Sequence, residues 1–133
     1  MADEAILMIE THPAIPFTVT DATAVPKGTI MTMSDPMTAT ATAAAADIVA
    51  GVAKNEKIAS DGKVSHPIYR GGIFKVTASG SITVGDALTT TTGGNRLITA
   101  PNTVENIWGE ALETASDGHT FLAELNPFTI NQA

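Results

Sequence analysis

The sequence contains no cysteine in its 133 residues. Disulfide bonds and thiolate metal sites are therefore excluded. Aromatic residues are also scarce, at 5%, with a single Trp and a single Tyr. The core must then be built largely from alanine and from β-branched side chains. Because β-branched residues are stiff at χ1, such a core suits packed strands better than long helices, and the composition predicts an all-β fold.

Positive charge is the next shortage, with 7 Lys and Arg against 14 Asp and Glu and a net charge of −7. The basic residues form no run, so neither nucleic acid nor an acidic membrane surface is an expected partner. No apolar run approaches the roughly 20 residues of a membrane-spanning helix. The stretch Met1–Glu10 has no basic region before its short apolar run, so no signal peptide is expected. We expect synthesis in a host cytoplasm and release by another route, such as assembly into a particle freed by lysis.

Short strand signals recur from Phe17 to the end of the chain. Apolar and polar residues alternate over stretches that end at Gly, Asp, Asn or Pro, as in half-buried strands bounded by turns. Examples are 17–20, 30–33, 64–68, 74–78 and 121–125. The pattern predicts a compact β-barrel or sandwich of short antiparallel strands. A chain of this length holds one core, so we expect a single β domain over residues 17–133.

The chain also repeats itself at a nearly constant spacing. The matched segments are Val25–Ile30 with Ile82–Leu88, Val49–Ala53 with Ile107–Ala111, and Ala59-Ser-Asp-Gly62 with Ala115-Ser-Asp-Gly118. Their matched glycines lie 57, 58 and 56 residues apart. Three landmarks in register predict an internal pseudo-duplication, with halves at about 25–70 and 82–127. The halves would be related by a pseudo-twofold axis or packed as halves of one barrel.

The duplication bears on the alanine run before Val49. Alanine is the best helix former, so this run could begin a helix. Its partner segment, Asn106–Leu112, has the pattern of a strand with a glycine where two backbones approach closely. We therefore expect a strand over Asp47–Ala53 and leave open a short helical turn within Thr40–Ala46.

Residues 1–16 differ from the rest of the chain. Prolines restrict themselves and the preceding residue to extended conformations, so this stretch predicts an extended N-terminal arm outside the central fold. The alternative is a frayed terminus. The apolar side chains favour an arm that docks on another surface. The candidate contact residues are Ile6, Leu7, Ile9, Pro13 and Ile15.

Motifs for catalysis or for metal binding are missing. The three histidines, His12, His66 and His119, form no short-spaced ligand pair, so we expect no metal and no cofactor. Ser60 and Asp61 with His66 could suggest a nucleophile triad. However, the same Ser-Asp turn recurs in the second half without a matching histidine, and no GxSxG elbow is present.

The remaining candidates for chemistry are weak as well. Glu110 and Glu113 are three residues apart on an expected strand, which places them on opposite faces. The pairs Gly71-Gly72 and Gly93-Gly94 continue into no phosphate-binding motif and are expected at hairpin turns. Trp108 is expected as a bulky core filler, with an exposed binding hot spot as the alternative. We therefore expect a protein that is not an enzyme.

Several segments, taken in order, resemble a family of tailed-phage capsid cement, or decoration, proteins. They are Thr20–Pro36, Asp47–Ala53 with Glu56–Ala59, Gly72–Leu88, and Gly109–Gly118 followed by a terminal strand. Each motif consists of turns and small residues. Their order and spacing over about residues 17–126 carry the resemblance.

The resemblance implies a structural virion protein on the outer capsid surface, with the major capsid protein as its partner and often present as a homotrimer. Such a protein bridges capsid subunits and stabilises the assembled shell. The resemblance supplies no catalytic residues. The alternative is a non-catalytic ligand- or carbohydrate-binding β module of a virion or cell surface, which needs an exposed aromatic platform. A small enzyme that uses the scattered histidines and carboxylates is a third reading, and it would need a bound metal.

Overall fold

The structure, a computed structural model, describes residues 3–92, 94–101, 103 and 106–129. Within these residues the chain forms strands, turns and bends and no helix, which confirms the predicted all-β class. No helix long and apolar enough to cross a bilayer is found in this part of the chain. The strands are β1 (Ile6–Ile9), β2 (Ile15–Thr18), β3 (Ile30–Asp35), β4 (Thr38–Ala41), β5 (Val49–Ala53), β6 (Ser65–Tyr69), β7 (Gly72–Thr77), β8 (Ala87–Thr90), β9 (Leu97–Thr99), β10 (Asn106–Ala111) and β11 (Thr120–Thr129).

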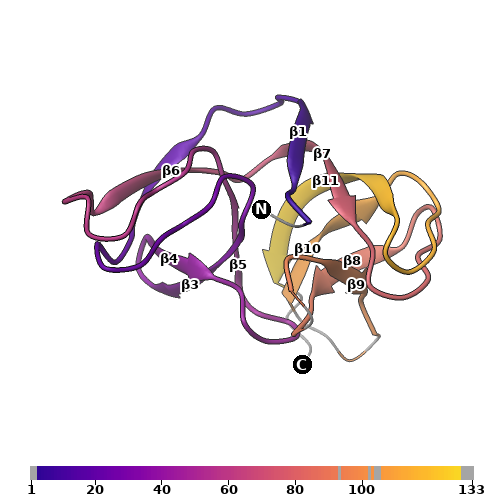
Figure 1. Cartoon of the computed structure of the whole chain (residues 1–133). Coiled ribbons are helices and arrows are strands. Elements are labelled where there is room, and N and C mark those ends of the chain that lie inside the picture. The colour runs from indigo at the N-terminus through magenta and orange to yellow at the C-terminus, as the bar shows by residue number, and fades with distance from the viewer. Residues whose placement is uncertain (1–2, 93, 102, 104–105, 130–133) are drawn as a thin grey trace.

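The first half of the chain folds into a closed barrel, which we call the first lobe. Its strand order is β2-β4-β3-β5-β6, and β6 pairs with β2 to close the ring. All neighbours are antiparallel except β2 and β4, which run parallel where Thr18 meets Thr38. The barrel lies on the left in Figure 1.

The second half, strands β7–β11, repeats this arrangement and is called the second lobe. The sheet order is β1-β7-β11-β10-β8-β9. Without the edge strand β1, the order β7-β11-β10-β8-β9 corresponds to β2-β6-β5-β3-β4 of the first lobe. As β4 does with β2 in the first lobe, β9 approaches the end of β7 in parallel, through a bridge between Leu97 and Ala78. Figure 1 shows this lobe on the right.

The backbone pairing outside the strands follows the duplication seen in the sequence. In the first lobe Val25 and Lys57 exchange two backbone hydrogen bonds. In the second lobe Ile82 and Ala115 exchange the same two bonds. These positions are 57 and 58 residues apart, the spacing of the sequence landmarks. The two halves are therefore one five-stranded unit built twice.

Two matched glycines lie where neighbouring backbones approach closely. A Cβ atom at Gly51 of β5 would overlap the carbonyl oxygen of Tyr69 on β6. A Cβ atom at Gly109 of β10 would overlap the carbonyl oxygen of Glu124 on β11. Each lobe thus requires glycine at the same point of its second hairpin, as the sequence pattern predicted.

Two hydrophobic clusters form the core. The smaller cluster fills the first lobe and consists of Phe17, Val19, Val25, Met31, Ala39, Ala50, Ala53 and Ile68. The larger cluster fills the second lobe around the fully buried Trp108, which confirms that residue as a core filler. The larger cluster also takes in alternate residues of the first lobe, including Ile30, Val49, Val52 and Tyr69. Strand side chains alternate in direction, and a bulge at Ala50 turns Val49 and Val52 to the same side, so these residues come from the outer face of the first barrel. That outer face is buried against the second lobe.

The N-terminal segment, expected to be an arm outside the fold, contributes two strands. β1 pairs antiparallel with β7 as an edge strand of the second lobe. β2 pairs with β6 in the first lobe, so the connection between β1 and β2 passes from one lobe to the other. Ala5, just before β1, is 3% exposed and belongs to the larger core cluster.

A single amide side chain ties three segments together beside this strand. Asn95, in the β8–β9 turn, accepts a hydrogen bond from the backbone N–H of Ile30 at 2.7 Å. Its Nδ2 donates to the carbonyl oxygens of Asp3 at 2.9 Å and Gly28 at 2.8 Å. The neighbouring Arg96 pairs with the Asp3 carboxylate at 2.9 Å. The N-terminal segment, the first lobe and the second lobe therefore meet at Asn95.

Some local expectations from the sequence were wrong. Gly71-Gly72 does not form a hairpin, since β6 pairs with β5 and β2 whereas β7 pairs with β1 and β11. The chain crosses there from the first lobe to the second. The expected strand over Asp47–Ala53 begins two residues later, at Val49. Asp47 instead accepts hydrogen bonds from the N–H groups of Ala43 and Ala44, which holds the alanine run in a turn.

The β5–β6 connection is organised by a buried lysine. The Lys57 side chain is fully buried, and its Nζ donates to the carbonyl oxygens of Asp21 at 2.7 Å and Ile58 at 3.2 Å. It also pairs with the Asp61 carboxylate at 3.0 Å. The backbone N–H of Lys63, together with the Lys57 ammonium, lowers the pKa of Asp61 to about 2, although partial desolvation opposes this. The ammonium thus has partners in place of water, as a buried charge requires.

We predict that Asn95→Ala lowers the free energy of unfolding by about 1–3 kcal/mol, because three backbone groups lose their partner at the lobe boundary. Chemical denaturation followed by Trp108 fluorescence measures this change. Asn55→Ala is the matched control, since the Asn55 side chain is exposed and makes no hydrogen bond with the described residues. Equal stability of the two variants would contradict the bridging role.

We predict that Asp61 stabilises the fold at neutral pH and ceases to do so in acid. Its folded pKa of about 2 lies below the ordinary value of 3.8, so the contribution is present above 3.8 and disappears as the pH falls toward 2. Denaturation of the wild type and Asp61→Asn across this range should show a stability gap that closes with falling pH. A gap that stays constant down to pH 2 would refute the assignment.

Candidate binding surfaces

The residues considered for catalysis are engaged in holding the fold. His66 is 4% exposed, and its Nε2 lies 2.7 Å from the carbonyl oxygen of Asn55. Asp61 pairs with Lys57, and the N–H of Ser60 donates to the carbonyl oxygen of Asp21 at 2.7 Å. Among the described residues no three His, Asp or Glu side chains are grouped so as to hold a metal ion. The structure therefore gives these residues structural partners.

The predicted contact residues lie on the two N-terminal strands and their connection. Ile6 and Ile9 on β1 are 46% and 56% exposed, and Ile15 on β2 is 38% exposed. Pro13, between the strands, is also exposed. Leu7 is half-buried and packs against the larger core cluster, so it anchors β1 to the fold. Four of the five predicted residues are thus at the surface.

One further residue extends this apolar surface. Met8 lies between the exposed isoleucines of β1 and is itself 53% exposed. β1 is also an edge strand of the described sheet, with β7 on one side. Exposed apolar side chains on an edge strand are unusual in a soluble protein that acts alone, because such edges pair readily with other chains. We refer to Ile6, Met8, Ile9, Pro13 and Ile15 as the N-terminal apolar surface.

A depression lies where this surface meets the end of β11. It has a volume of about 270 Å³. Its lining includes Ile15 and His12 from the N-terminal segment, Arg70 and Gly71 from the crossing between lobes, and Pro127 from β11. The hydroxyl oxygen of Thr11 lies 3.0 Å from Nδ1 of His12. Ile15 thus lies beside the second half of β11.

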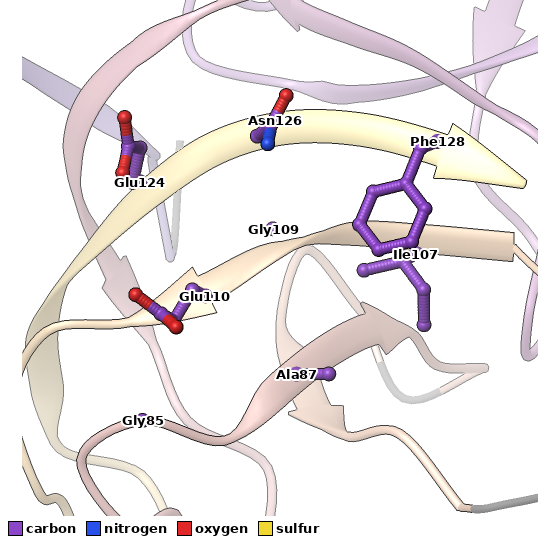
Figure 2. Close-up of a pocket in the computed structure, with 8 residues that line it drawn as sticks. All are labelled: Gly85, Ala87, Ile107, Gly109, Glu110, Glu124, Asn126 and Phe128. Atoms are coloured by element: carbon purple, nitrogen blue, oxygen red, sulfur yellow. The ribbon is translucent and has the colours of Figure 1, made fainter.

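A second depression, of about 210 Å³, lies on the outer face of the second lobe and was not predicted (Figure 2). Ile107 and Phe128 lie side by side at one end, and Glu110 and Glu124 lie at the other. The two glutamates are direct partners in the β10–β11 ladder. In the sequence, the glutamate near Glu110 is Glu113. In the structure Glu113 lies beyond β10 and accepts a hydrogen bond from the N–H of Leu122. The register of the β10–β11 hairpin, which pairs Glu110 with Glu124, cannot be read from the sequence. We call this depression the β10–β11 groove.

The aromatic side chains do not form an exposed platform. Of the described aromatic residues, Phe128 is the one with a large exposed fraction, at 49%. Trp108 is fully buried and Tyr69 is 8% exposed. Burial, and next the Glu10 carboxylate, raise the pKa of Tyr69 above its ordinary value. The feature that would favour carbohydrate binding is therefore not found in the described residues.

Known proteins resemble this chain in sequence and in fold. The sequence profile of the family described as phage cement protein matches residues 9–125. The comparison with curated protein sequences gave no match. Among solved structures, the head fiber gp8.5 N base in bacteriophage phi29 is similar, with a TM-score of 0.58 and 17% sequence identity. The alignment covers 94% of this chain and 100% of that one. At this identity the structural likeness concerns the fold alone.

The family profile extends over nearly the whole chain, from the β1 edge strand to the middle of β11. It therefore includes both lobes of the duplicated fold. The chain belongs to the phage cement protein family, a family of structural proteins of phage particles.

Proposed function

We propose that this protein binds the outer surface of a phage capsid and stabilises the assembled shell by bridging subunits of the major capsid protein. Membership of the phage cement protein family is the observation that carries the proposal. The physical mechanism is linkage: a ligand that binds the assembled lattice and not the free subunits stabilises the assembled state. Many copies that each contact more than one subunit increase the effect through multivalency.

We further propose that the N-terminal apolar surface is a contact with the capsid or with a neighbouring copy. Ile6 and Ile9 leave large apolar areas in water, and burying each would contribute roughly 1–2 kcal/mol. β1 can also accept a further strand on its free edge, which adds backbone hydrogen bonds to the apolar contact. The resemblance of the sequence to decoration proteins supports trimers at threefold positions as the arrangement of copies on the shell.

The low positive charge fits an outer location. A net charge of −7 on each copy would give decorated particles a negative surface, and like-charged particles repel one another at low salt. The same charge disfavours contact with the packaged nucleic acid inside the shell. Both arguments support a location outside rather than inside the particle.

We predict that replacing both exposed isoleucines of β1, in Ile6→Ser/Ile9→Ser, weakens capsid binding about 30-fold or more, because about 2 kcal/mol of apolar burial is removed. Co-sedimentation with capsids of the source phage that lack this protein measures affinity and copy number. Point substitutions are preferable to deletion of the segment, since Ala5 is part of the core.

The matched control is Ile58→Ser/Val64→Ser, which removes two residues that are 68% and 57% exposed in the first lobe. It should bind capsids as the wild type does. Saturable binding that is unaffected by the β1 substitutions would preserve the function and refute the assigned surface. Failure of the wild type to bind capsids would refute the proposed function itself.

A further inference from the structure

Two matched glycines differ in what covers them. Gly28 of the first lobe and Gly85 of the second occupy the same turn of the repeated unit. A Cβ atom at Gly28 would overlap the Glu4 side chain, and the N–H of Ala5 donates to the Gly28 carbonyl oxygen at 3.1 Å. At Gly85 a Cβ atom would meet no described atom within 4 Å. The chain's own N-terminal segment therefore covers one of two equivalent turns and leaves the other open.

The sheet face beside each glycine shows the same difference. In the first lobe Val52 pairs with Ile30 on one side and Tyr69 on the other, and all three are buried in the larger core cluster. In the second lobe the corresponding residue, Glu110, pairs with Ala87 and Glu124. These three line the β10–β11 groove and are exposed (Figure 2). The groove is thus the uncovered counterpart of a face that the protein itself covers in the first lobe.

The uncovered face carries unbalanced negative charge. Glu110 and Glu124 are directly opposite each other on antiparallel strands, where like charges destabilise a sheet. None of the described Lys and Arg side chains forms an ion pair with either carboxylate. Beside them Phe128, which is 49% exposed, supplies an apolar end over its ladder partner Ile107, which is 3% exposed. Such a groove would gain free energy from a ligand that brings a cation and an apolar group together.

We propose that the β10–β11 groove binds an extended, basic segment of the major capsid protein. A Lys or Arg side chain of that segment lies between Glu110 and Glu124, and an adjacent apolar side chain packs on Phe128. This inference rests on the proposed function and names a second contact, on the lobe opposite the first barrel. Charge disfavours a second copy of this chain as occupant, because the segment that covers the equivalent turn contains the acidic Asp3 and Glu4.

The first test removes the charge from the groove. Capsids of the source phage that lack this protein are mixed with wild type and with E110Q/E124Q, and bound protein is measured by co-sedimentation over a series of salt concentrations. We expect E110Q/E124Q to bind about tenfold more weakly at low salt, since each partly exposed ion pair contributes up to about 1 kcal/mol. Its affinity should also depend less on salt than that of the wild type.

The matched control is D35N/E56Q, which removes two negative charges from exposed residues of the first lobe that have no ion-pair partner. It should retain wild-type affinity. An equal loss in both variants would show an effect of net charge and would overturn the groove. Equal binding by E110Q/E124Q and wild type would overturn it as well.

The second test identifies the occupant. Because the chain has no cysteine, a single introduced thiol can be labelled with a photo-crosslinker at one position. A87C places the label in the groove, and A22C places it at an exposed residue of the first lobe. On decorated capsids we expect A87C, and not A22C, to yield a crosslink to a major-capsid-protein peptide that contains Lys or Arg.

The outcomes separate the two proposals. Wild-type protein that fails to bind capsids overturns the proposed function. Wild-type protein that binds, with no A87C crosslink above the A22C background, overturns the groove alone. A crosslink from A87C to another copy of this chain also overturns the proposal, because it assigns the groove to self-association.

Discussion

The burial of the first lobe's outer sheet face is the contact on which the rest of the structure depends. Ile30, Val49, Val52 and Tyr69 point away from the first barrel and into the core of the second lobe. The larger hydrophobic cluster therefore belongs to both five-stranded units, whereas the smaller one lies within the first lobe. Asn95 of the second lobe lies beside this contact, and its side-chain amide forms hydrogen bonds with the first lobe and with the N-terminal segment. A small domain with few aromatic residues thus gains a larger shared core than either half holds alone.

This shared cluster makes the duplication asymmetric, and the asymmetry determines which sheet face is exposed to solvent. Packing one lobe's outer face on the other lobe leaves the equivalent face of the second lobe uncovered. The substitutions follow the environment: where the first lobe has Ile30, Val52 and Tyr69, the second has Ala87, Glu110 and Glu124. Apolar residues lie where the face is buried, and charged or small residues lie where it is open to solvent. A similar exchange occurs inside the two lobes, where Trp108 of the second lobe has the position that Ala50 has in the first.

The N-terminal segment has two roles in this arrangement. Ala5 and Leu7 pack inward and fix β1 to the second lobe, whereas Ile6, Met8 and Ile9 remain exposed. The exposed side chains are therefore presented on a fixed strand, which lowers the entropy that a flexible arm would lose on binding. The proposed contact with a capsid needs no disorder-to-order transition in this segment. Together with the proposed β10–β11 contact, it would give the domain two separate contact surfaces, as the proposed bridging between subunits requires.

The amino-acid sequence by itself determined the all-β class, the duplication and the close approach at Gly51 and Gly109. The strand pattern follows from local rules, since side-chain alternation and turn residues act over a few residues. The duplication can be read directly from the repeated spacing of its landmarks. The family resemblance and the exposed isoleucines of β1 were also within reach of the sequence. The sequence could not show that residues 6–9 pair with β7, nor that Gly71-Gly72 joins two lobes instead of forming a hairpin, because strand pairing depends on contacts distant along the chain. Only the tertiary structure placed Glu110 opposite Glu124, since a hairpin's register is set by how the two strands pack on the core and not by the residues of either strand alone.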